Sequence, residues 1–146
     1  MFAYDKLDRF YGEMEQRITA MKAEGAEAIV LFIHWGAEYQ TYTTSSQPVI
    51  AQKMCDLGVD VIIGGHPHVV QPVEVLTSNT DPGRKTLCVY SLGNAMSNQR
   101  SSNMDLTTGH TEDGMLFTFT YNFLAATLRA VGNTRTALYF LLISLG

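Results

Sequence analysis

Residues 61–72 read VIIGGHPHVVQP. A short run of apolar residues stops at two glycines, and two histidines then flank a proline. A continuous apolar run of this length is typical of a strand that is covered on both faces of a sheet. The segment therefore predicts a buried strand with two imidazoles placed directly after its end.

A second apolar run, AIVLFIH at residues 28–34, predicts another buried strand, and a helix is predicted between the two strands. Ser46 is placed to cap this helix, and Pro48 suits its first turn. Gly58 is expected to end the helix. Its apolar residues are expected to face inward: Val49, Ile50, Met54 and Leu57.

The order strand, helix, strand predicts a parallel pair of strands joined by a right-handed crossover. Parallel strands end at the same edge of a sheet, and open α/β sheets bind ligands at that edge. His34 closes the first strand, while His66 and His68 follow the second. Pro67 keeps His66 out of helical geometry, and residues two apart on an extended backbone project to one side. We therefore expect the three imidazoles to gather at one edge.

Neutral imidazole is the commonest protein ligand for zinc, iron, manganese and related ions, and a bound divalent ion lowers the pKa of its water towards 7. Gly64 and Gly65 carry no Cβ and are expected to let the backbone turn close to a bound group. One interpretation is a metal site at His34, His66 and His68. The alternative is a set of ordinary loop histidines, since four histidines in 146 residues are unremarkable.

The remaining segments complete an α/β pattern. Strands are predicted at residues 28–34, 59–64, 69–76, 86–92 and 114–121, and helices at residues 5–24 and 47–57. Pro72 favours an edge position or a bulge for the third of these strands. Residues at spacings of three and four mark the inner face of the first helix: Leu7, Phe10, Met14, Ile18 and Met21.

Composition narrows the functional classes. The chain is about one domain long, 46% of its residues are hydrophobic, and its net charge is −4. Because it has no basic run, it offers no electrostatic footprint for nucleic acid. Cys55 and Cys88 are expected to be buried free thiols. No signal peptide is predicted, because no basic segment followed by an apolar one opens the sequence. No membrane-spanning segment is predicted either, because the apolar run near residue 146 is too short to cross a bilayer.

Three motifs occur in order: HWGAEY, GGHPHVVQP and YSLGN. Together they resemble the CapA-type poly-γ-glutamate capsule synthesis family, a branch of the calcineurin-like metallophosphoesterase superfamily, over residues 28–94. The resemblance implies half of a metallophosphoesterase-like α/β-β-α sandwich with a two-metal site at the strand ends. His34 and His66 would match ligands of one metal, and His68 a ligand of the other.

The resemblance also places further residues beside the metals. Trp35, Glu38 and Tyr39 would line the loop next to the histidines, with Trp35 as a cleft wall. Glu38 either hydrogen-bonds a ligating imidazole or is an exposed loop carboxylate. Asn94, at a strand end, either reaches substrate or makes a turn. His110 lies in a polar loop and is expected to be solvated.

The superfamily's first half normally supplies an Asp-x-His, a bridging Asp and an Asn-His pair, and none of these lies upstream of His34. We therefore expect residues 1–122 to be the C-terminal half of such a domain, with residues 123–146 a tail of uncertain structure. The missing N-terminal half would be its partner. The cofactor expected is one weakly bound manganese, iron or zinc ion rather than two.

Two hypotheses about function remain. The chain either contributes to a metal-dependent hydrolase or transferase of capsule biosynthesis, or it is a non-catalytic remnant or interaction domain. The substrate expected for the first is a cell-envelope polymer or a phosphoester, and family resemblance suggests the cell envelope or the extracellular space. Unpaired strand edges also predict self-association.

Overall fold

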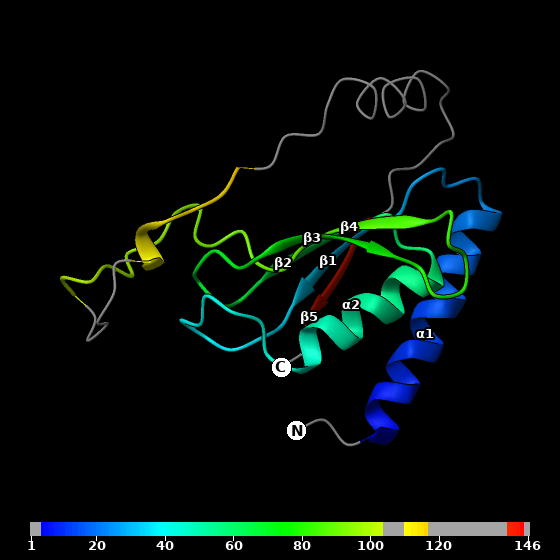
Figure 1. Ribbon diagram of the computed structural model, residues 1–146, viewed down its shortest axis with the longest axis horizontal. Coiled ribbons are helices and arrows are strands. Elements are labelled where there is room, and N and C mark those ends of the chain that lie inside the picture. The colour runs from blue at the N-terminus through cyan, green and yellow to red at the C-terminus, as the bar shows by residue number, and fades with distance from the viewer. Residues whose placement is uncertain (1–3, 104–109, 117–139, 145–146) are drawn as a thin grey trace.

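The computed structural model describes residues 4–103, 110–116 and 140–144 (Figure 1). It is a mixed α/β fold with one five-stranded sheet in the order β3-β4-β2-β1-β5. The helices are α1 (Tyr4–Ala23) and α2 (Ser46–Leu57), with a short 3-10 helix, η1 (His110–Glu112). The strands are β1 (Val30–His34), β2 (Val61–Gly65), β3 (Val73–Thr77), β4 (Lys85–Val89) and β5 (Phe140–Ser144). Neither long helix is apolar enough along its length to cross a membrane.

The parallel pairing predicted for the two central strands is confirmed. β1 and β2 run parallel, and His34 lies opposite Gly65 in their register. β2 also pairs in parallel with β4, and β3 pairs with β4 in antiparallel orientation at the edge of the sheet. Of the two alternatives expected from Pro72, an edge position or a bulge, the structure has the edge position. The carboxyl ends of β1 and β2 lie side by side, which positions the histidines.

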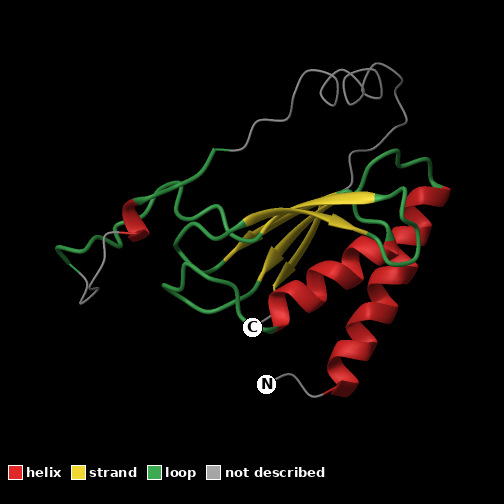
Figure 2. Ribbon diagram, in the orientation of Figure 1, coloured by secondary structure: helices red, strands yellow, loops and turns green. Residues whose placement is uncertain are grey.

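Both helices pack on the same face of the sheet (Figure 2). Alternation along the strands directs Leu31 and Ile62 towards the helices, where they meet Met14 of α1 and Met54 of α2. These side chains are at most 1% exposed. The apolar spacing of the first helix is confirmed, since Met14 and Ile18 are buried and its other apolar residues pack against the same core.

The N-terminus of α2 differs from the prediction. Ser46 is the first helical residue, and Ser45 occupies the cap position without a side-chain hydrogen bond. Gln47 caps the turn instead, because its Oε1 accepts a hydrogen bond from the Thr44 amide at 2.8 Å. Val49 is 60% exposed, so the prediction that it faces inward is wrong. Val49 lies on the solvent-facing side of α2, whereas the buried side of the helix includes Gln47 and Ala51.

The first four predicted strands are each shorter in the structure, at five residues, and the fifth is not formed where it can be described. β3 begins only at residue 73, and Val70 forms an isolated bridge with Leu92. In the predicted strand at residues 114–121, Gly114 makes only an isolated bridge with Gly93, and residues 117–121 lie outside the described part. Glycine at both bridge positions leaves no side chains to pack across the pair, which weakens strand formation here.

The fifth strand of the sheet comes from the segment expected to be a tail of uncertain structure. β5 pairs in parallel with β1, with Phe140 opposite Val30. This backbone pairing places β5 at the edge of the sheet opposite β3. The predicted boundary at residue 122 falls in a part of the chain outside the described residues.

The two thiols and the face of the sheet opposite the helices complete the description. Cys55 and Cys88 are free and buried, as predicted. On the face away from the helices, Val73 and Val75 of the edge strand are 39% and 63% exposed. The structure is thus a sheet with one face well covered and an edge that leaves valines in contact with solvent.

Candidate metal centre

Three histidines lie at the carboxyl edge of β1 and β2, as the topology predicted. The ring centroids of His34 and His66 are 4.3 Å apart, and those of His66 and His68 are 6.2 Å apart. His34 is exposed, whereas His66 and His68 are half-buried. The edge therefore carries a row of imidazoles in contact with solvent.

The backbone brings His66 and His68 together in a way that the sequence did not predict. Their φ angles are 99° and 60°, in the left-handed region that non-glycine residues rarely adopt. The expected extended segment is therefore wrong: the chain bends through residues 66–69, with positive φ at His66 and His68. Such conformations cost on the order of 1–3 kcal/mol each and are concentrated at functional sites.

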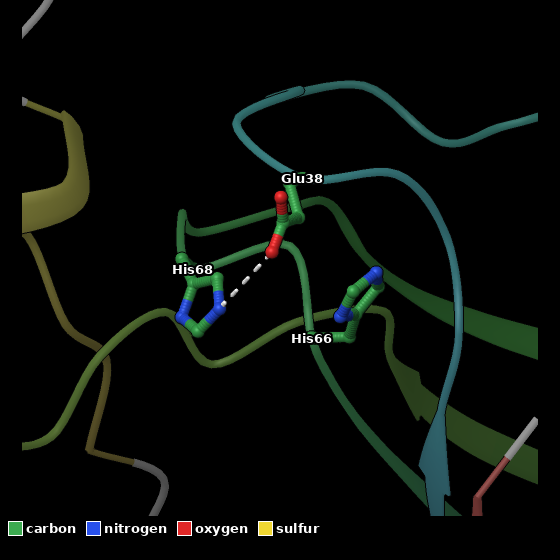
Figure 3. A group of neighbouring side chains, drawn as sticks. All are labelled: Glu38, His66 and His68. Atoms are coloured by element: carbon green, nitrogen blue, oxygen red, sulfur yellow. Dashed lines mark ion pairs between the residues drawn. The ribbon is translucent and has the colours of Figure 1, made fainter. Parts of the chain in front are cut away.

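The carboxylate of Glu38 lies close to two of these imidazoles (Figure 3). Glu38, His66 and His68 each offer one ligand atom, and these atoms all lie within 4.8 Å of one another. Ligand atoms around a tetrahedral zinc ion lie about 3.3 Å apart, so a modest inward movement of these side chains would bring them to coordination distance. The three residues form a group that could hold a divalent cation. His34 is outside this group in the structure.

The loop that carries Glu38 is tied to the loop that carries the histidines. The Tyr39 amide donates a hydrogen bond to the Pro67 carbonyl at 2.8 Å, and Tyr39 itself has a φ of 63°. The Tyr39 ring stacks on the ring of His68, with centroids 6.1 Å apart. Tyr39 thus lies beside the histidines, as expected. Its backbone hydrogen bond to Pro67 holds the neighbouring residue Glu38 close to them.

A buried pair of glutamines also holds the loop that carries Glu38. Gln47 donates from Nε2 to Oε1 of Gln71 at 2.8 Å, and both side chains are at most 2% exposed. Gln71 then donates to the carbonyls of Gln40 and Tyr42, each at 2.9 Å. Sequence reasoning missed both glutamines. The polar residue at 71 in an otherwise apolar stretch, VVQP, was the one signal available.

His68 is also held from its other side. Nδ1 of His68 lies 2.9 Å from Oδ1 of Asn94, and Nε2 lies 3.8 Å from Oε1 of Glu38. The sequence analysis gave Asn94 two alternative roles, a substrate contact or a turn, and predicted no contact with His68. Asn94 therefore acts in the structure as a hydrogen-bond partner of a candidate ligand.

Trp35 lies in the core and not on an open cleft. It is 3% exposed, stacks on Tyr90, and donates from Nε1 to the Tyr90 carbonyl at 2.8 Å. Gly64 lies against this pair, because a Cβ at that position would overlap the Tyr90 carbonyl and Trp35 Nε1. The expected role of Gly64, close approach to a bound group, is thus wrong: the close approach is to Tyr90. Gly65 has open space around it.

The surroundings of His66 favour its neutral form. Burial lowers the pKa of His66 below its usual 6.5, and the neighbouring His34 and His68 lower it further, while Glu38 acts in the opposite direction. A histidine must be neutral to bind a metal, so these effects keep His66 ready as a ligand near neutral pH. His110 is exposed, as expected, and its Nδ1 lies 3.5 Å from the Asp113 carboxylate.

A polar cavity of about 290 Å³ adjoins the histidine edge. It is lined by residues between 94 and 100 and by Thr111 and Glu112. Asn94 belongs to both this cavity and the surroundings of His68, so the two features share a wall.

Comparisons with known proteins identify relatives in two bacilli. The chain is 39% identical over 74 residues to the PGA biosynthesis protein CapA of Bacillus subtilis (strain 168), which covers 51% of this chain and 18% of that protein. It is 36% identical over 78 residues to the capsule biosynthesis protein CapA of Bacillus anthracis, covering 53% of this chain and 17% of the relative. The matched part is thus less than a fifth of either relative. No solved structure matches the chain.

The family comparison covers most of the described region. Residues 4–99 match the model for the bacterial capsule synthesis protein PGA_cap, a span that includes both helices, four of the five strands and every residue of the candidate metal group. The α/β fold is consistent with part of a metallophosphoesterase-like domain, as the resemblance implied. This chain therefore belongs to the PGA_cap family of bacterial capsule synthesis proteins.

Proposed function

We propose that this chain contributes a metal-binding half-site to a hydrolase- or transferase-type reaction in capsule biosynthesis. The observation that carries the proposal is the convergence of Glu38, His66 and His68 at the sheet edge. Two imidazoles and a carboxylate suit zinc, iron or manganese better than calcium or magnesium, which prefer all-oxygen sites. The names of the two CapA relatives support the capsule as the biological context.

The site has the chemistry to activate water but not to complete a two-metal reaction. A bound divalent ion supplies a Lewis acid and hydroxide near neutral pH. Two-metal sites hold their ions about 3.5–4 Å apart between shared ligands. Among the described residues, Glu38 is the one carboxylate in the candidate group, and His34 stands beside His66 as a further imidazole. We propose that another segment or chain supplies the remaining ligands.

The substrate that fits this proposal is a cell-envelope polymer, poly-γ-glutamate by resemblance, or a phosphoester. The corresponding location is the cell envelope or the extracellular space. The alternative is an interaction domain without activity, which the exposed valines of the edge strand favour. The two proposals differ in whether the histidine edge binds a metal.

Metal binding is the first test. Titration calorimetry with zinc or manganese should give one equivalent for the wild type. The double variant His66→Ala/His68→Ala should remove binding, and Glu38→Gln should weaken it. His110→Ala is the matched control, because His110 is exposed and outside the group. Two tightly bound equivalents, or binding that survives in the double variant, would overturn the proposed site.

Turnover is the second test. The chain alone should hydrolyse generic phosphoesters and poly-γ-glutamate negligibly with added manganese, zinc or iron. The described residues offer one candidate cation group, whereas a two-metal reaction needs two ions that clamp the substrate between them. Robust metal-dependent turnover by this chain that His68→Ala abolishes would show that its site is complete.

A further inference from the structure

We propose that Asn94 is a positioning residue that sets the tautomer of the neutral His68 ring, with its proton on Nδ1. The Nε2 lone pair is then presented to Glu38 and to any cation held between them. The tautomer follows from hydrogen bonds within this chain, whereas its consequence for metal binding rests on the proposed function.

The orientation of the Asn94 amide is set by its other contacts. Its Nδ2 lies 3.0 Å from the carbonyl oxygen of Thr111 and 3.1 Å from Oε1 of Gln99. A carbonyl oxygen can only accept a hydrogen bond, so the amide nitrogen must face Thr111. Both amide hydrogens are then in use, and Oδ1 is left to face His68.

The tautomer of His68 follows from that orientation. Oδ1 of Asn94 is an acceptor without a hydrogen, so Nδ1 of His68, 2.9 Å away, must donate to it. In a neutral ring the proton can occupy only one nitrogen, which leaves Nε2 as a lone pair. Hydrogen bonds to the second nitrogen of a ligating histidine set ring orientation and tautomer in this way at metal sites.

The lone pair on Nε2 meets another electron-rich atom. Oε1 of Glu38 lies 3.8 Å away, beyond hydrogen-bond distance (Figure 3). With Nδ1 carrying the only proton of the neutral ring, neither Nε2 nor the carboxylate has a hydrogen to offer the other. A cation between the two atoms would satisfy both.

A closed circuit of side chains holds this arrangement. Gln99 accepts from Asn94 and places its Nε2 3.4 Å from the hydroxyl of Tyr39, whose ring stacks on His68. The ring of His68 is therefore bounded on its face by Tyr39 and at its edge by Asn94. The circuit joins the loops after β1, β2 and β4, which are far apart in the sequence.

The backbone around Asn94 is anchored independently of its side chain. Gly93 forms a bridge with Gly114, and the Met115 amide donates to the Leu92 carbonyl at 2.8 Å. Replacing the Asn94 side chain should therefore leave the course of the loop in place, which makes substitution a test of the hydrogen bond.

The test is long-range ¹H–¹⁵N NMR on the metal-free, ¹⁵N-labelled chain at a pH where the imidazoles are neutral. The wild type should show His68 protonated on Nδ1. Asn94→Ala should shift His68 towards the Nε2-protonated form that free histidine prefers. Asn98→Ala, an exposed asparagine of the same loop, is the matched control and should change nothing.

Zinc titration gives an independent readout. Asn94→Ala should lower zinc affinity by about 10–100-fold, and Asn98→Ala should leave it unchanged. An Nε2-protonated His68 in the wild type would overturn the inference even if Asn94→Ala fails to fold, as would a tautomer that ignores the substitution. An Nδ1-protonated His68 in a chain that binds no metal would instead refute the proposed function and leave the assignment of Asn94 standing.

Discussion

The imidazole rings of His34 and His66 lie with their centroids 4.3 Å apart, at the ends of two parallel strands. At this separation a positive charge on one ring disfavours a charge on the other. Burial lowers the pKa of His66 most, and His34 is the next cause. These effects favour a neutral His66 ring, the form that metal ligation requires.

Removing His34 should raise the pKa of His66. His34→Ala deletes the like-charge neighbour but not the burial, so the His66 pKa should move towards 6.5 and stay below it. NMR titration of the ring C–H signals measures this change. His110→Ala should leave the His66 titration unaltered, and a His66 pKa that falls or stays constant in His34→Ala would contradict the electrostatic coupling.

The two adjacent glycines of β2 should respond differently to the same substitution. Gly64→Ala places a methyl group against the Tyr90 carbonyl and Trp35 Nε1, and should reduce the free energy of unfolding by about 3 kcal/mol or more. Gly65→Ala has open space and should change it by less than about 1 kcal/mol. Urea denaturation of both variants measures the difference, and equal losses would show that the packing around Gly64 is wrong.

The edge strand should promote association between copies of the chain. β3 has a single strand neighbour in the described sheet, and Val75 on it is 63% exposed. Exposed apolar edges template pairing, and a lysine on an edge suppresses it. Val75→Lys should therefore increase the monomer fraction in sedimentation velocity.

Val49→Lys is the control for this experiment. Val49 is 60% exposed but lies on α2, where the backbone hydrogen bonds are satisfied within the helix. A wild type that is already a clean monomer would contradict the prediction, as would an equal effect of the two substitutions.

Asp56 should make stability depend on pH in the acid range. Burial alone would raise its pKa, but hydrogen bonds from Asn79, Gln52 and Ser78 outweigh burial and bring the pKa below the usual 3.8. A carboxyl with a lower pKa in the folded state contributes stability above pH 3.8, and this contribution is lost as pH falls through the folded value.

Asp56→Asn should thus lower the free energy of unfolding by about 1–2 kcal/mol near neutral pH and flatten its decline below pH 4. Thermal unfolding across pH 2–7 tests both points. Asp8→Asn, at an exposed position of α1, should reproduce neither effect. An unchanged acid profile in Asp56→Asn would show that these hydrogen bonds do not form in solution.

Much of the fold was accessible from local pattern. The apolar runs that end at His34 and Gly65, with a helix between them, required a parallel pair, and that pair placed the histidines at one edge. The edge position of β3 agrees with one of the two consequences expected of Pro72, because proline cannot donate a hydrogen bond to a neighbouring strand. The local sequence pattern could not predict the pairing of β5 with β1, because the two strands are more than 100 residues apart in the sequence.

Which residues form the candidate metal group, and which residues hold them in place, depended on tertiary structure. Sequence reasoning favoured His34 with His66 and His68, whereas the structure brings Glu38 to the latter two, because the Tyr39–Pro67 hydrogen bond and the buried Gln71 fix its loop. Asn94 meets His68 across 26 residues. Local periodicity determines strands and helices, but loop side chains take their positions from distant partners, and no repeat along the chain encodes those partners.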